Sequence, residues 1–97
     1  MPAATRIGDA DDTHCSTPFR AQGSPNVNVN GIPWSRQGDV NTTHLLPCGD
    51  KCCKHTASIS VGSKTVFVNG KGAGRIGDKI TGCTSVAQGS SNVNAGG

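Results

Sequence analysis

Aromatic side chains are scarce in this sequence. Its 97 residues include two Phe, one Trp and no Tyr, and only 33% of them are hydrophobic. A chain of this length forms one small domain, and with so few large apolar side chains its core is thin. Small domains of this kind often need a metal ion or a disulfide to reach ordinary stability. We therefore expect residues 1–97 to form a single domain that is held together in part by such a cross-link.

Glutamate is absent, and charge of either sign is sparse. Charged residues make up 15% of the chain, and its net charge of +3 is spread out rather than gathered in one basic block. Proteins that bind nucleic acid or a membrane surface are expected to carry such a block. The aspartates stand mostly in predicted turns, which leaves no evident general base for a hydrolase. The composition argues against an enzyme and against a basic binding surface.

Long apolar runs and helical periodicity are also missing. No segment is long enough to cross a bilayer, and the opening MPAATRIGDADD has neither a positive leader nor an apolar run. We expect a protein that is made in the cytoplasm without a signal peptide and leaves, if at all, by another route. Five cysteines, an odd number, favour metal ligation or free thiols over a disulfide framework. Because no window has a 3.6-residue period over three turns, the chain is predicted to be all-β.

What the sequence does contain is a repeat. The pattern Arg-x-Gly-Asp occurs at residues 6–9, 36–39 and 75–78. Five residues after each Asp stands a side chain that can bind a transition metal: His14, His44 and Cys83. Within the pattern, Gly allows positive φ while Arg and Asp can pair across a turn. We therefore interpret Arg-x-Gly-Asp as a turn and not as a catalytic signature.

A second repeated element precedes these turns. The segments GSPNVNVNG, GSKTVFVNG and GSSNVNAG align at residues 23–31, 62–70 and 89–96. Their alternating Val and Ala residues are typical of half-buried strands. Asn30-Gly31 and Asn69-Gly70 predict tight turns, since both residue types tolerate positive φ.

The order of these elements predicts a closed ring. The segment ASISV, Ala57–Val61, is expected to pair with Val66–Val68 through a turn at Gly62-Ser63. The third unit stops at Gly96-Gly97, where its Arg segment should begin, and the first starts directly with PAATR. Joining the two ends completes three units, which a ring requires and a linear solenoid does not. We expect the termini to lie together and the three ligand positions to converge on a pseudo-threefold axis.

These units resemble the PAAR-repeat proteins, and the resemblance covers essentially the whole chain. It rests on VNVNGIPWSRQGD, VFVNGKGAGRIGD, the opening PAATRIGD and the ligand positions. Residues 2–6 read Pro-Ala-Ala-Thr-Arg, with one residue inserted into the motif that names the family. The resemblance implies an all-β fold: a small cone of short strands and turns with pseudo-threefold symmetry from three internal repeats, stapled by a metal ion.

The resemblance also implies a function. Members of the family sit on the blunt end of a trimeric β-helical spike, VgrG-like in bacterial type VI secretion systems or part of a contractile phage tail. One copy caps each trimer and sharpens the tip that pierces a membrane without residing in it. Longer members carry fused effector domains, whereas this chain has no effector extension, so any effector is expected to bind non-covalently. The protein would then be delivered outside the cell or stand at the tip of a virion tail.

The ligand positions predict one structural zinc ion. Zinc prefers four N or S ligands, and His55 is the only histidine outside the three repeat positions. The predicted ligands are His14, His44, His55 and Cys83, and the resemblance likewise implies three histidines and one cysteine near the apex. A rival site within CGDKCC would use Cys48, Cys52 and Cys53 with His55. These thiols would otherwise face solvent in an insertion loop, or Cys48 would pair with one of the other two; Cys15 is expected to be a small buried residue.

A small zinc-stabilised nucleic-acid-binding module is the alternative function. It requires a helix behind the ligands, a Lys/Arg stripe and stacking aromatics. The sequence contains none of these. A zinc hydrolase would need an open coordination position, which four protein ligands close.

Overall fold

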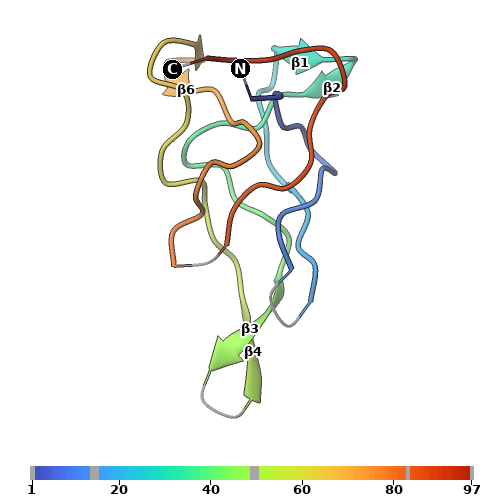
Figure 1. The fold of residues 1–97 in the computed structure, drawn as a ribbon, viewed down its shortest axis with the longest axis vertical. Helices are drawn as coiled ribbons and strands as arrows, with labels where there is room; N and C mark the ends of the chain where they lie inside the picture. Colours follow the sequence, from blue (N-terminus) through green and yellow to red (C-terminus); the bar gives the residue numbers. More distant parts are fainter. Residues whose placement is uncertain (1, 14–15, 49–50, 83, 97) are drawn as a thin grey trace.

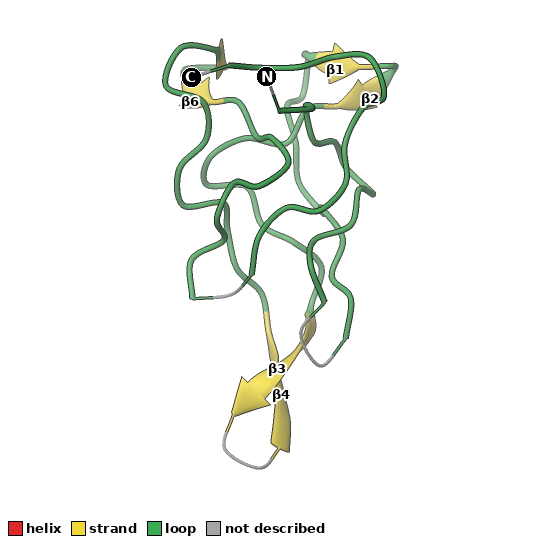
Figure 2. Ribbon diagram, in the orientation of Figure 1, coloured by secondary structure: helices red, strands yellow, loops and turns green. Residues whose placement is uncertain are grey.

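The computed structural model describes residues 2–13, 16–48, 51–82 and 84–96. In this part of the chain there is no helix, and six short strands form three separate antiparallel hairpins. The hairpins are β1 (Asn28–Val29) with β2 (Ile32–Pro33), β3 (His44–Cys48) with β4 (Lys51–His55), and β5 (Phe67–Val68) with β6 (Lys71–Gly72). Figure 2 shows that loops and turns make up most of the rest. The all-β prediction is confirmed, and the described part therefore offers no helix long and apolar enough to span a membrane.

Local turn chemistry forms the β1–β2 and β5–β6 hairpins. The φ angles are 54° and 77° in Asn30-Gly31 and 56° and 78° in Asn69-Gly70. Both residues of each turn thus lie in the left-handed region, which a type I′ hairpin requires and which Asn and Gly tolerate best. Val29 and Val68 are buried, while the residue before each is exposed. The predicted tight turns are confirmed, and so are half-buried strands in the first two segments. In the third segment Asn94 forms only an isolated bridge with Ala3.

The predicted pairing of residues 57–61 with Val66–Val68 is wrong. Ser58 pairs with Val40 and Ile59 with Ile80, while β5 pairs with β6. The two-residue Asn-Gly turn closes β5 onto β6 with a very short loop, which favours this pairing over one through Gly62-Ser63. Ile59 in turn packs in a buried cluster with Ile80 and Val86, so its apolar side chain gains more from the non-local partner.

The molecule tapers from a broad end to a narrow one, with principal extents of 39 × 23 × 21 Å. Figure 1 shows β1, β2, β6 and both chain ends at the broad end, and the β3–β4 hairpin at the narrow end. Ala3 pairs with Asn94, and the Ala95 N–H donates to the Pro2 carbonyl at 3.0 Å. The prediction that the ends of the chain lie together is confirmed.

Small side chains fill the interior. One buried cluster consists of Val68, Ala73 and Ala95, with Val27, Trp34 and Val66 packed against it. The other consists of Ile59, Ile80 and Val86. Trp34 adds an aromatic ring to the first cluster but is only partly buried. The apolar contribution is therefore small, as the composition predicts, and polar contacts between segments carry more of the fold.

Candidate functional site

Three segments, one from each repeat, meet in a closed ring of backbone hydrogen bonds. The Thr5 N–H donates to the Gly74 carbonyl at 3.1 Å, Gly74 donates to Ser35 at 2.9 Å, and Ser35 donates to Thr5 at 3.0 Å. Each residue immediately precedes the Arg of an Arg-x-Gly-Asp segment. Thr5 and Ser35 are fully buried, and a Cβ at position 74 would lie 2.6 Å from the Ser35 oxygen. Glycine is therefore needed at position 74 to let the three backbones approach.

Each Arg-x-Gly-Asp segment is a turn closed by an ion pair. The pairs are Arg6–Asp9 at 2.9 Å, Arg36–Asp39 at 2.8 Å and Arg75–Asp78 at 2.8 Å. In each copy the Arg backbone N–H also donates to the carboxylate, and the Gly has φ of 89°. Hydrogen bonds to Asp9 and Asp39 raise the pKa of Arg6 and Arg36, against the opposing effect of burial. The turn interpretation is confirmed, because these charges are used inside the fold.

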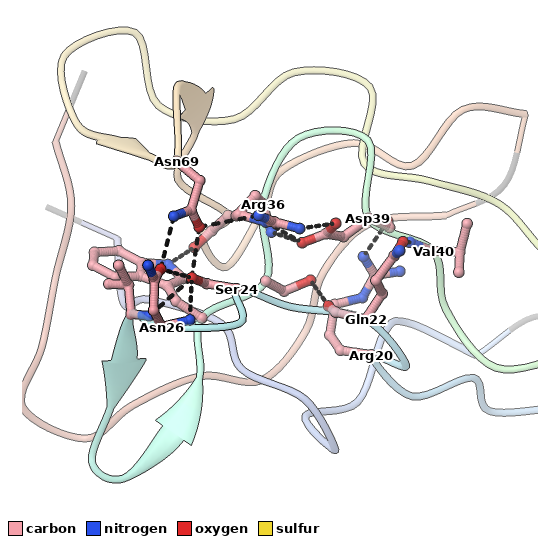
Figure 3. A network of polar contacts seen from close by, with 12 residues as sticks. Arg20, Gln22, Ser24, Asn26, Arg36, Asp39, Val40 and Asn69 are labelled. Atoms are coloured by element: carbon pink, nitrogen blue, oxygen red, sulfur yellow. Dashed lines mark hydrogen bonds and ion pairs between the residues drawn. The ribbon is translucent and has the colours of Figure 1, made fainter.

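The same arginines join one repeat to another. Their Nη1 atoms donate to Asn30 Oδ1 (from Arg6, 3.1 Å), Asn69 Oδ1 (from Arg36, 3.0 Å) and the Gly96 carbonyl (from Arg75, 3.0 Å). A serine hydroxyl donates to each of these acceptors: Ser90 to Asn30, Ser24 to Asn69 and Ser63 to Gly96. Figure 3 shows the junction at which Arg36 and Ser24 converge on Asn69. The serine contacts run from repeat one to two, from two to three and from three back to one, so they form a cycle.

At the narrow end, the β3–β4 hairpin brings two of the predicted metal ligands together. His44 and His55 lie directly opposite each other in the hairpin register. Their Nε2 atoms are 2.8 Å apart, and their rings meet edge to face with centroids 4.3 Å apart. His44 is buried and His55 is half-buried. The hairpin thus positions two imidazoles on the same small volume.

The orientation of the His44 ring fits a metal ligand. Its Nδ1 lies 2.8 Å from the Thr42 carbonyl oxygen, which can only accept, so Nδ1 carries a proton in this contact. In the neutral ring Nε2 then has the lone pair that a metal needs. Metal-binding histidines are commonly oriented by this kind of hydrogen bond from the other ring nitrogen. Two converging imidazole nitrogens are also donors that zinc accepts readily. The described half of the predicted site therefore has suitable chemistry.

The other two predicted ligands, His14 and Cys83, lie outside the described residues, as does Cys15. A described neighbour of His14 reaches the hairpin, because the Leu45 N–H in β3 donates to Ser16 Oγ at 2.9 Å. Across residues 2–13, 16–48, 51–82 and 84–96, no group of three or more His, Cys, Asp or Glu side chains is placed to hold a metal ion. The complete four-ligand set stays a prediction.

The described residues of CGDKCC lie in paired strands, where the sequence led us to expect an insertion loop. Cys48 lies in β3 opposite Lys51, while Cys52 and Cys53 lie in β4 opposite Pro47 and Leu46. Pairing is continuous from His44 and His55 to Cys48 and Lys51, so both flanks of the segment form strands. The Cys-rich site and the pairing of Cys48 stay predictions.

A buried polar cluster joins the first repeat to the second. Asp11 Oδ2 accepts hydrogen bonds from Arg20 Nη2 at 2.9 Å and from Asn41 Nδ2 at 3.1 Å. The Asp11 and Arg20 side chains are 0% exposed, and Asp11 Oδ1 and Arg20 Nε have no hydrogen-bond partner among the described residues. Burial raises the pKa of Asp11, although Arg20 and Asn41 act in the opposite direction. No pocket opens onto this cluster or elsewhere in the described structure, and its hydrogen bonds join segments of the fold to one another.

Sequence reasoning missed two groups of residues. It placed Ser63 in a turn and gave Ser24 and Ser90 no role of their own, although the recurrence of this serine in all three repeats was a usable signal of a shared contact. Arg20 offered no such signal, because the equivalent positions hold Ile59 and Val86. The three positions are equivalent because the carbonyls of Arg20, Ile59 and Val86 accept the same backbone hydrogen bond, from Gly8, Gly38 and Gly77 respectively.

Comparison with known proteins adds one match. Residues 8–84 match the family described as the PAAR motif. No curated protein matches the chain. The matched span contains all three hairpins. It begins within the first Arg-x-Gly-Asp segment, residues 6–9, and ends six residues after the third, residues 75–78.

Proposed function

The chain belongs to the PAAR-motif family, and from this premise we propose that it is the structural tip of a membrane-puncturing spike. The family is associated with spike-tip proteins of type VI secretion systems and contractile phage tails, and it is structural rather than enzymatic. The chain would cap a trimeric β-helical spike, one copy per trimer. It would be delivered outside the cell or stand at the tip of a virion tail as part of that machine.

The cyclic contacts among the three repeats carry this proposal. The hydrogen-bond ring of Thr5, Ser35 and Gly74 and the three Arg–Ser junctions relate the repeats to one another in the same way. We infer a pseudo-threefold axis through this ring. A single chain with three similar faces can meet three identical subunits of a symmetric trimer. Such a cap also covers the open strand edges at the end of a β-helix, which would otherwise invite aggregation.

At the narrow end we propose one structural zinc ion. His44 and His55 would supply two nitrogen ligands, and His14 and Cys83 would complete a tetrahedral set. Bound there, the ion supplies a closed cross-link without catalytic chemistry. Structural zinc contributes an apparent ~10–16 kcal/mol in small folds, which is comparable with the ~5–15 kcal/mol net stability of an ordinary domain. A chain with so small an apolar core therefore gains a rigid point from it.

Stoichiometry tests the proposed cap. The purified chain would be mixed with the end fragment of the trimeric β-helical spike protein from the same genome and measured by size-exclusion light scattering. We expect one chain per trimer, with affinity that depends only weakly on salt because apolar burial and strand-edge pairing drive the contact. Failure to bind, or three chains per trimer, would contradict the cap. Binding abolished by moderate salt would instead favour the nucleic-acid alternative.

A further inference from the structure

One hairpin at the broad end carries an exposed aromatic ring that its counterparts lack. Phe67 in β5 is 61% exposed. Asn28 in β1 and Asn94 hold the equivalent positions in the other two repeats, and both are exposed as well. Each of the three immediately precedes a buried apolar residue of the repeat. Since two repeats fold with an amide at this exposed position, the fold itself does not require an apolar side chain there.

A second position in the same repeat also has an exposed apolar residue where the other two repeats have a polar one. Val61 is 53% exposed, whereas Gln22 and Gln88 stand at the equivalent positions in the other repeats. The Gln22 side chain accepts a hydrogen bond from the Val40 N–H at 3.2 Å, and Gln88 accepts one from the Ala10 N–H at 2.9 Å. Valine cannot make this bond. The middle repeat thus exposes apolar surface where its counterparts form polar contacts.

The backbone brings these two apolar residues onto neighbouring segments. Phe67 pairs with Gly72 across the β5–β6 hairpin. A Cβ on Gly72 would lie 2.7 Å from the Ser63 carbonyl oxygen, so the segment that follows Val61 packs directly against β6. The Ser63 N–H also donates to the Ala73 carbonyl at 2.8 Å. Val61 and Phe67 therefore flank one contact at the broad end.

We propose that Phe67, supported by Val61, is the residue that anchors the chain on one subunit of the trimeric spike and determines its affinity. This inference rests on the proposed function. Aromatic side chains dominate the binding energy of many protein interfaces, and the two other repeats fold without an apolar side chain at either position. Because the three spike subunits are identical, each presents the same surface. Phe67 packs against this surface on one subunit, and Asn28 and Asn94 face the same surface on the other two subunits.

Two opposite substitutions test this anchor, with the trimeric spike fragment as the probe. Phe67→Asn should weaken the Kd about 30-fold, the loss typical of an interface hot spot. Asn28→Phe should tighten it about tenfold, because a second ring meets a second identical surface. Asn94→Phe provides the same test in the third repeat if Asn28→Phe fails to fold. Isothermal titration gives both affinity and stoichiometry.

Phe19→Asn is the matched control, since Phe19 is also exposed but lies outside the hairpin positions. It should leave the Kd unchanged, and thermal melts should show all variants folded. If the chain binds one per trimer and neither Phe67→Asn nor the gain-of-ring variants alter the Kd, the anchor is overturned and the cap stands. If the wild-type chain does not bind at all, the cap itself is overturned.

Discussion

Arg20 departs from the repeat at the scale of a single residue. The equivalent positions hold Ile59 and Val86 in an apolar cluster, whereas Arg20 is a fully buried charge paired with Asp11. An apolar side chain at this position would avoid the desolvation of two charges, which often cancels the attraction between them. Removing one partner alone would leave the other charge buried and unpaired, at a cost of about 3–5 kcal/mol. Repeat symmetry is thus a guide to the backbone and not to every side chain.

The titration of Asp11 gives a prediction at this scale. Burial raises the pKa of Asp11 in the folded protein. The folded protein therefore holds this proton more tightly than the unfolded chain, in which Asp has a pKa of about 4. The stability gained is fully present below that value and is lost as pH rises through the raised folded pKa. Asp11→Asn removes the titration, so the free energy of unfolding of wild type minus variant should fall as pH increases from about 4.

Urea unfolding of both proteins at matched metal content measures this difference. Arg20, Asn41 and His44 are the groups that oppose the raised pKa, and all three are present in both proteins. A difference that grows with pH would show instead that the pairing with Arg20 outweighs burial.

At the scale of the element, local signals predicted the two Asn-Gly turns but not the strands β2 and β6 that follow them. Asn30-Gly31 and Asn69-Gly70 fix their turns through positive φ, and the sequence contains that information directly. The β3–β4 hairpin has no such pattern, because HLLPC and KCCKH do not alternate polar and apolar residues and Pro47 argues against a strand. Ile59 was paired wrongly because its partner Ile80 is distant in the chain. The sequence predicted His44 and His55 as ligands, and the register of this hairpin brings them together.

Substitutions in and near the β3–β4 hairpin distinguish between the two alternative metal sites that the sequence predicts. Wild type should retain about one zinc ion per chain after dialysis. His14→Ala with His44→Ala should lose it and melt at a lower temperature, because the proposed cross-link is gone. Cys52→Ser with Cys53→Ser, which leaves the histidine pair intact, should keep the ion. Elemental analysis that found zinc in the first variant and none in the second would replace this site with the Cys-rich one.

At the scale of the whole molecule, the cyclic contacts lead us to expect that the fold does not depend on where the chain is opened. Ala95 and Pro2 are joined by a backbone hydrogen bond, and Ser90 donates to Asn30 as Ser24 does to Asn69. A closed arrangement of this kind has no terminal repeat that needs a separate cap, unlike a linear solenoid.

Circular permutation tests this closure. Joining residue 97 to residue 1 by a short linker and reopening the chain within residues 48–53 should give a folded protein that still binds zinc, because the new link spans ends that already meet. Circular dichroism, thermal melting and metal analysis check the result against wild type. A permutant that does not fold while its uncut, linked parent does would contradict a closed ring.

The ring of Thr5, Ser35 and Gly74 also sets the order in which the protein can acquire its structure. Thr5 bonds both to Gly74 and, through its hydroxyl, to the Gln88 carbonyl 83 residues away. On the ribosome, Thr5 is synthesised before both of these partners. Contacts so distant in sequence make folding slow, since loop-closure entropy is lost before they form. The ring therefore cannot close before residue 74 has emerged, and the contact of Thr5 with Gln88 forms later still.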